Sequence, residues 1–167
     1  MEAVLVVGGN RGNVGRTTAL VAELLERRAG AITARSKIYR SAAWGFRADD
    51  FYNCAFVVET TLEAEALLDT LQDIERLAGR DREAEQAEKR RTGERYASRT
   101  ADIDIIFYGD EVIDTPRLTV PHPLFRQRMF VLEPLCEIIP DKADPASGRS
   151  VRELYNELKG SNKGSNR

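Results

Sequence analysis

Two helix-forming segments alternate with short apolar strands in this chain, and their order constrains the fold more than any other feature. Helices are predicted over 17–28 and 63–78, where apolar side chains recur every three or four residues. Strands are predicted over segments rich in β-branched and aromatic residues, namely 3–7, 32–39, 51–60 and 100–108. The order β-α-β-β-α-β predicts a ferredoxin-like α+β fold, in which an antiparallel sheet has its helices packed on one face.

The remaining sequence predicts a loop, two further helices and a tail. Residues 115–128 contain three prolines and are predicted to be a loop, followed by short helices over 130–139 and 150–158. A chain of 167 residues is expected to form a single domain, here over 1–159. The low-complexity residues 160–167 are predicted to be a disordered tail.

Charge and composition exclude several classes of protein. A net charge of −2 argues against a dedicated nucleic-acid binder, which normally has a strongly basic domain. No apolar run is long enough to span a bilayer, and the first residues lack the basic region of a signal peptide. Cys54 and Cys136 have no zinc-binding spacing and look like small buried hydrophobes in a reducing compartment. We expect a soluble, cytoplasmic monomer that binds neither nucleic acid nor membrane.

Asp102-Ile-Asp104 carries the clearest chemical signal. Residues two apart on a strand point to the same face, so the two carboxylates are predicted to lie side by side, about 7 Å apart. Unpaired, they would repel by roughly 2 kcal/mol at an effective dielectric near 20. A divalent cation bound by oxygen ligands would offset that repulsion, but a solvated strand edge is an equally open interpretation. Arg99, three residues before Asp102, adds a guanidinium group whose geometry suits hydrogen bonding to a phosphate.

A long charged segment leads into this strand. Residues 80–99 hold seven arginines and lysines against five acidic residues. Charge runs of this kind are usually solvated, yet a loop this long in a compact domain is either functional or disordered. A lid over a bound polyphosphate is the functional interpretation. Arg80, Arg82 and Arg99 are the best candidates, because they flank the loop where the structure is expected to be firm.

Four other features can each be explained structurally from the residues alone. The loop Gly8-Gly-Asn-Arg-Gly-Asn13 is either a tight turn or a backbone that a flat ligand approaches closely. Asn53, on the same strand face as Phe51, is either a satisfied structural amide or a reader of a heterocycle edge. Gln72 and Glu75 share one helix face and by spacing alone are surface polarity. His122, in a basic setting, either donates to a phosphate or stabilises a turn.

The ordered set of motifs is far more specific than any one of them. It comprises Gly8-Gly-Asn-Arg-Gly-Asn13, Phe51-Tyr-Asn53, Leu71-Gln-Asp-Ile-Glu75, Gly79-Arg-Asp-Arg82, Arg99-Thr-Ala-Asp-Ile-Asp-Ile105 and Arg117-Leu-Thr-Val-Pro-His122. In this order the motifs resemble the 6-hydroxymethyl-7,8-dihydropterin pyrophosphokinase family, from the first strand to about Asp141. The resemblance implies a ferredoxin-like fold and transfer of diphosphate from ATP to the pterin, with release of AMP, in folate biosynthesis.

The resemblance also implies roles for individual residues. Asp102 and Asp104 would hold two Mg²⁺ ions, and Arg82 and Arg99 would join them as catalytic residues. The residues that would contact the pterin are Ser41, Ala42, Trp44, Phe51, Asn53 and Phe130. The residues that would contact ATP are Gln72, Glu75, Arg80, Arg82, Arg99, Ile105, Arg117, Thr119, His122 and Arg128.

Two other functions are compatible with parts of the sequence. A metal-dependent nucleotidyltransferase would also use paired aspartates but would transfer a nucleotide. An RNA-binding module can share the ferredoxin-like sheet, although the chain lacks the aromatic strand motif of such domains and its carboxylate strand would repel phosphate without metal.

Overall fold

The computed structural model describes residues 1–10, 13–41, 51–79, 90–91 and 101–165. At its centre is an antiparallel sheet with the order β2-β4-β1-β5, and β3 pairs with β4 beside β2. The strands are β1 (Glu2–Gly9), β2 (Ala31–Arg35), β3 (Tyr39–Ser41), β4 (Phe51–Glu59) and β5 (Asp102–Tyr108). Since β4 lies between β1 and β2 and is antiparallel to both, β1 and β2 run parallel to each other. The predicted ferredoxin-like α+β fold is confirmed.

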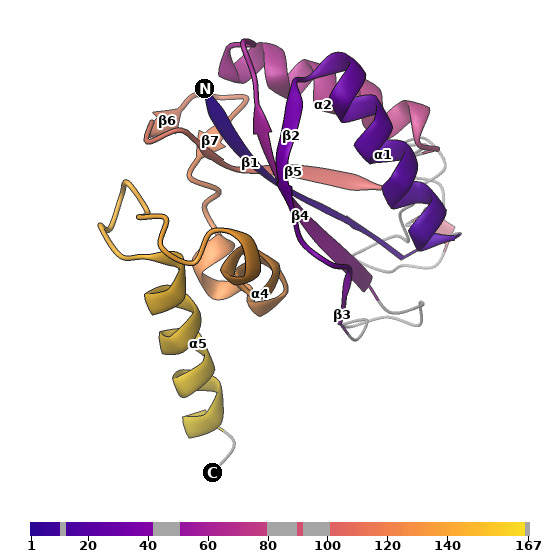
Figure 1. Cartoon of the computed structure of the whole chain (residues 1–167). Coiled ribbons are helices and arrows are strands. Elements are labelled where there is room, and N and C mark those ends of the chain that lie inside the picture. Colours follow the sequence, from indigo (N-terminus) through magenta and orange to yellow (C-terminus); the bar gives the residue numbers. More distant parts are fainter. Residues whose placement is uncertain (11–12, 42–50, 80–89, 92–100, 166–167) are drawn as a thin grey trace.

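Helices cover both faces of the sheet (Figure 1). α1 (Val14–Arg28) and α2 (Ala64–Leu77) lie on one face, and α4 (Met129–Ile138) and α5 (Val151–Ser165) lie on the other, where the far end of α5 extends away from the body. The expectation that helices pack on one face only is therefore wrong. The physical reason is the run of buried residues in β1, since side chains on both of its faces need apolar cover.

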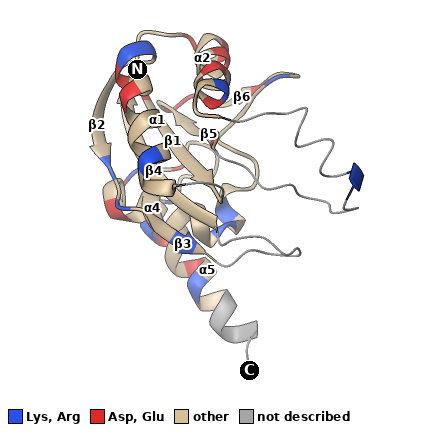
Figure 2. Cartoon of the chain, turned by 90° about the vertical axis from the view of Figure 1, so that its right-hand side faces the viewer, with Lys and Arg blue, Asp and Glu red and all other residues tan. Residues whose placement is uncertain are grey.

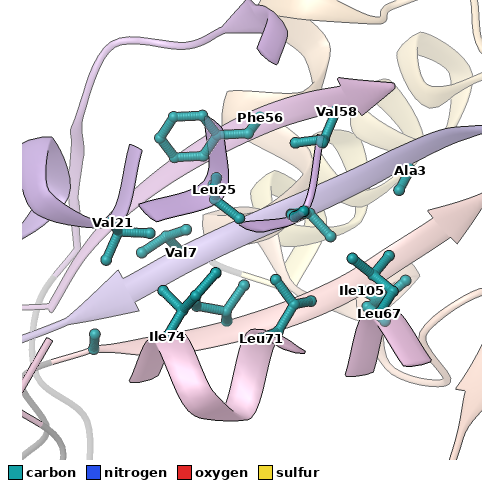
Figure 3. Close-up of a cluster of buried hydrophobic side chains, with 14 of the residues drawn as sticks. Ala3, Val7, Val21, Leu25, Phe56, Val58, Leu67, Leu71, Ile74 and Ile105 are labelled. Atoms are coloured by element: carbon teal, nitrogen blue, oxygen red, sulfur yellow. The ribbon is translucent and has the colours of Figure 1, made fainter. Parts of the chain in front are cut away.

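Two hydrophobic clusters lie on the two faces. On the first face, Leu71 and Ile74 of α2 point toward Val7 of β1 (Figure 3). On the second, Val6 of β1 packs in a cluster with Leu132 of α4 and other residues of α4 and α5. Alternate residues of each central strand therefore belong to different clusters, as the period of a strand requires.

Several elements differ from their predicted bounds. The strand predicted over 32–39 is divided into β2 and β3, because residues 36–38 leave the extended ladder. The predicted loop 115–128 contains β7 (Thr119–Val120), which pairs with β6 (Ile113–Asp114), and a 3-10 helix over Phe125–Gln127. The segment from Gly160 onward was expected to be a disordered tail, whereas the structure continues α5 through Ser165.

The surface carries both signs of charge. Figure 2 shows acidic and basic residues interspersed along α2 and α5. Both cysteines are unpaired; Cys54 is buried as predicted, while Cys136 is partly exposed. Within the part of the chain that the structure describes, none of the helices is both long and apolar enough to cross a membrane.

Candidate functional site

The register of four strands aligns polar residues in a row across one end of the sheet. Tyr39 pairs with Asn53, Asn53 pairs with Gly8, and Gly8 pairs with Asp102. Paired residues of antiparallel strands project to the same face, so these four positions face the side covered by α4. Asn53 and Asp102 lie two strand spacings apart, which is about 10 Å. An amide and a carboxylate thus flank the glycine on one face of the sheet.

Asp104 lies in the next row on the same face. It pairs with Val6, which in turn pairs with Ala55, and both of these apolar residues belong to the cluster beneath α4 and α5. Asp102 and Asp104 are both partly exposed, while Ile103 between them is buried on the opposite face. The predicted placement of the two carboxylates on one strand face is confirmed. Among the strands that the structure describes, β5 pairs only with β1 in this sheet.

The donor set suits one kind of metal. Among the residues that the structure describes, no group of three or more His, Cys, Asp and Glu side chains is placed to hold a metal ion. Two carboxylates alone would leave most coordination positions of a cation to other oxygens. Mg²⁺ is typically bound in this way, through one or two carboxylates together with water and substrate phosphates. Asp102 and Asp104 therefore fit Mg²⁺ in the presence of a phosphate ligand.

A buried carboxylate of α2 forms a hydrogen bond to β5, the strand that carries Asp102 and Asp104. Glu75 is only 3% exposed, and its Oε2 accepts a hydrogen bond of 2.9 Å from the backbone N–H of Ile103. That N–H belongs to the residue between Asp102 and Asp104. Loss of a buried acceptor costs about 1–3 kcal/mol, so Glu75 holds the outer edge of β5 firmly. Glu75 was predicted as an ATP contact, and its structural hydrogen bond was not foreseen.

His122 lies close to both Asp102 and Arg128. Its backbone N–H donates to the carbonyl of Ile106 on β5 at 3.1 Å, and its Nδ1 accepts from the N–H of Leu124 at 3.2 Å. Burial lowers the pKa of His122 below 6.5, and the nearby Arg128 guanidinium lowers it further, while the Asp102 carboxylate opposes both. The imidazole is therefore neutral at pH 7, with Nε2 as its remaining donor.

Asn53 and Gly8 are packed against each other. Asn53 is 7% exposed, and a Cβ added at Gly8 would lie 2.7 Å from its Oδ1. Any larger residue at position 8 would push the amide out of place. The role of Gly8 itself was missed in the sequence, where the glycine-rich loop drew notice only as a whole. The need for glycine at position 8 can be recognised from its place opposite a buried Asn, but only once the register between β1 and β4 is known.

The start of α4 brings together residues from both predicted ligand sets. The Arg128 guanidinium lies over the ring of Phe130, 5.6 Å from its centroid. Phe130 is 41% exposed, which is unusual for a large apolar side chain beside a well-packed helix. On the sheet, Ser41 pairs with Phe51 at the ends of β3 and β4. Phe51 and Phe130 thus come from different layers of the fold, as two walls of a pocket require.

Other predicted residues lie differently or cannot be placed. Arg117 forms an exposed ion pair with Asp69 of α2, and Thr119 is exposed on β7. The side chain of Ile105 is packed in the first core cluster, so only its main chain is open to a ligand. Gln72 is partly exposed on α2. Five of the predicted residues lie outside the described part of the chain: Ala42, Trp44, Arg80, Arg82 and Arg99.

Comparison with known proteins points in one direction. Residues 4–140 match the model of the family described as 7,8-dihydro-6-hydroxymethylpterin-pyrophosphokinase. The chain is 38% identical to a 2-amino-4-hydroxy-6-hydroxymethyldihydropteridine pyrophosphokinase of Synechocystis over 157 residues, which is 93% of this chain and 75% of the relative. It is also 38% identical to the protein of that name from Bacillus subtilis over 140 residues, 81% of this chain and 77% of the relative.

Solved structures show the same fold. A Plasmodium falciparum HPPK-DHPS structure superposes with a TM-score of 0.77 at 17% identity. The match covers 97% of this chain but only 46% of the Plasmodium chain. The present chain thus spans less than half of that longer protein, and at this identity the likeness concerns the fold alone.

Proposed function

The chain belongs to the 7,8-dihydro-6-hydroxymethylpterin-pyrophosphokinase family, and from this premise we propose how its own residues carry out the reaction. The activity is ATP-dependent transfer of diphosphate to 6-hydroxymethyl-7,8-dihydropterin, in folate biosynthesis. The hydroxymethyl oxygen forms a bond to the β-phosphorus, and the bond from that phosphorus to the bridging oxygen of the α-phosphate breaks. AMP leaves with that oxygen, the proton of the hydroxymethyl group is released to water, and the pterin keeps the diphosphate.

Asp102 and Asp104 are the residues proposed to hold Mg²⁺, with two ions expected. When bound, the cations would neutralise phosphate charge and orient the in-line displacement. Support comes from two partly exposed carboxylates on one face of an edge strand, held in place by the hydrogen bond between Glu75 and the Ile103 N–H. Phosphoryl transfer depends mainly on positioning and charge stabilisation, so the chain needs no covalent nucleophile.

The observation that carries the proposal is the row formed by Asn53, Gly8 and Asp102. In it, Asn53 would read the amide edge of the pterin while Phe51 and Phe130 stack on its ring. Gly8, which has no side chain, would let the Asn53 amide lie close against the sheet. The separation of about 10 Å between Asn53 and Asp102 lets one small substrate reach from the first to the second.

ATP is proposed to bind near the partly exposed carboxylates of β5. Gln72 and Glu75 would contact it from α2, and His122 and Arg128 would contact it from the opposite side of the strand. A neutral His122 would donate a hydrogen bond from Nε2, and the guanidinium of Arg128 would add positive charge. Arg82 and Arg99 are expected to guide the triphosphate. Localisation in the cytoplasm and a monomeric state stay predictions.

Product identification tests the function. The protein is mixed with ATP, Mg²⁺ and 6-hydroxymethyl-7,8-dihydropterin, and the phosphorus-containing products are resolved by ³¹P NMR. The expected products are AMP and a pterin carrying two phosphates, and neither should form when the pterin is omitted. Free pyrophosphate together with an AMP-linked pterin would contradict diphosphate transfer and indicate nucleotidyl transfer instead.

A further inference from the structure

Glu137 of α4 forms a hydrogen-bonded bridge to the segment that leads into β3. Its Oε1 accepts from the Tyr39 hydroxyl at 2.7 Å. The backbone N–H of Lys37 donates to both carboxylate oxygens, at 3.2 and 3.3 Å. Glu137 is exposed, and no part of the proposed chemistry uses it. Three hydrogen bonds converging on a surface carboxylate, from a segment about a hundred residues away in sequence, are more than surface polarity requires.

The segment that Glu137 contacts is fixed to the sheet. Ser36, directly before Lys37, donates its N–H to the carbonyl of Ala55 on β4 at 2.9 Å. Its hydroxyl accepts from the Ala55 N–H at 2.8 Å and donates to the carbonyl of Lys37 at 2.7 Å. The side chain of Ser36 thus replaces a missing rung of the ladder between β2 and β3. Glu137 therefore binds a segment that is itself hydrogen-bonded to the sheet.

Both ends of the bridge continue into the pterin pocket. On α4, Glu137 is seven residues after Phe130, which is two helical turns, so the two side chains share one side of the helix about 10 Å apart. On the sheet, Tyr39 pairs with Asn53, and Ser41 pairs with Phe51. The bridge consequently links the layer that carries Phe130 to the layer that carries Asn53 and Phe51.

The hydroxyl of Tyr39 remains a donor throughout the neutral range. Burial raises its pKa, and the hydrogen bond to the Glu137 carboxylate raises it further. The bridge is therefore intact under any condition in which the enzyme is assayed near pH 7.

We propose that Glu137 is a positioning residue for the pterin, because its hydrogen bonds to Tyr39 and Lys37 set the separation between Phe130 and the Asn53 wall of the pocket. The inference rests on the proposed pterin site. Glu137 does not touch the substrate; it acts through the placement of α4 on β3. Its loss should weaken pterin binding while leaving ATP binding, on the other side of Asp102, unchanged.

The test compares Glu137→Ala, Glu137→Gln and Tyr39→Phe with the control Asp141→Asn, which removes an exposed partner of Arg152 without touching the bridge. Pterin affinity is measured by the fluorescence of 6-hydroxymethylpterin at saturating α,β-methylene ATP. Affinity for the nucleotide analogue alone is measured by calorimetry. Glu137→Ala should weaken pterin binding about tenfold, Tyr39→Phe a few-fold, and the nucleotide affinity should stay within twofold of wild type.

Glu137→Gln distinguishes positioning from charge. The amide oxygen of Gln still accepts from Tyr39 and Lys37, so this variant should recover most of the pterin affinity lost in Glu137→Ala. Pterin affinity within twofold of wild type in both Glu137→Ala and Tyr39→Phe would overturn the proposal, as would a parallel loss of nucleotide affinity. Failure of the wild-type protein to bind the pterin would instead contradict the assignment of the pocket itself.

Discussion

The two faces of the sheet differ in polarity at adjacent residues of the same three strands, β4, β1 and β5. On the face beneath α1 and α2, Cys54, Val7 and Ile103 form a buried apolar row. On the face toward α4, the adjacent row holds Asn53, Gly8 and Asp102. At this level the first face is apolar, whereas the second becomes polar where the cluster beneath α4 and α5 stops. Each strand thus contributes to the core on one side and to the proposed binding site on the other.

This difference predicts that substitutions at neighbouring residues will reduce different properties, namely turnover on one face and stability on the other. Asp104→Asn should reduce turnover by about 10³-fold or more, because it removes a proposed metal ligand. The free energy of unfolding should change far less, because Asp104 is partly exposed and belongs to neither hydrophobic cluster. Ile105→Ala, one residue on and 4% exposed in the first cluster, should instead cost about 2–5 kcal/mol of stability. Urea unfolding and steady-state kinetics on both variants make the comparison.

The pair of variants can also break the comparison. If Asp104→Asn unfolded as readily as Ile105→Ala, the polar face would be a structural element and not a site. If the folded fraction of Ile105→Ala were as inactive as Asp104→Asn, the first face would take part in the reaction directly.

A second pair of variants sharpens the polar row. The Cβ added by Gly8→Ala would lie 2.7 Å from the amide oxygen of Asn53, so the Asn53 side chain would have to move. Loss of one hydrogen bond, worth about 1.4 kcal/mol, should weaken pterin binding about tenfold. Gly15→Ala in α1 is the matched control, because among the described residues its Cβ would meet only the Asn13 side chain, at an ordinary 3.6 Å. That variant should bind pterin normally and be more stable by about 0.5–1 kcal/mol.

The smallest predicted effect concerns His122, the chain's only histidine, whose single imidazole signal is resolved by ¹H NMR. Its titration midpoint should lie below 6.5. Arg128→Met should raise the pKa of His122, and Asp102→Asn should lower it. Because the unfolded chain then binds the proton more tightly than the folded one, His122 should lower stability as the pH falls below about 6.5. A midpoint that neither variant moves would contradict the placement of His122 beside both groups.

The sequence predicts the elements of this fold better than it predicts the site. Hydrophobic periodicity identifies α1, α2, β4 and β5 to within a few residues, since it reflects local burial. The row of Asn53, Gly8 and Asp102 depends on the register between strands distant in sequence, which no local pattern specifies. The helices α4 and α5 were predicted, but their packing on the second face was not, because the uninterrupted apolar run of β1 was not interpreted as burial on both sides.

Individual residues in the site illustrate the same limit. That Asp102 and Asp104 lie on one face of a strand was predictable, because their relation is fixed within that strand. The roles of Glu75 and Glu137 were not, since each carboxylate looks like surface polarity until its partner is known. Glu75 is buried against the Ile103 N–H, and Glu137 binds the segment before β3. Their hydrogen bonds arise only when distant segments pack together.

The central claim is that Asp102 and Asp104 anchor the metal and triphosphate at the polar end of the second face. It is tested most directly by counting Mn²⁺ ions bound per chain by electron paramagnetic resonance, with α,β-methylene ATP present because the bond that must break is then replaced. The wild-type protein should bind two ions in the presence of the analogue, and the double variant Asp102→Asn/Asp104→Asn should lose them while remaining folded. Unchanged Mn²⁺ binding in the double variant would contradict the claim.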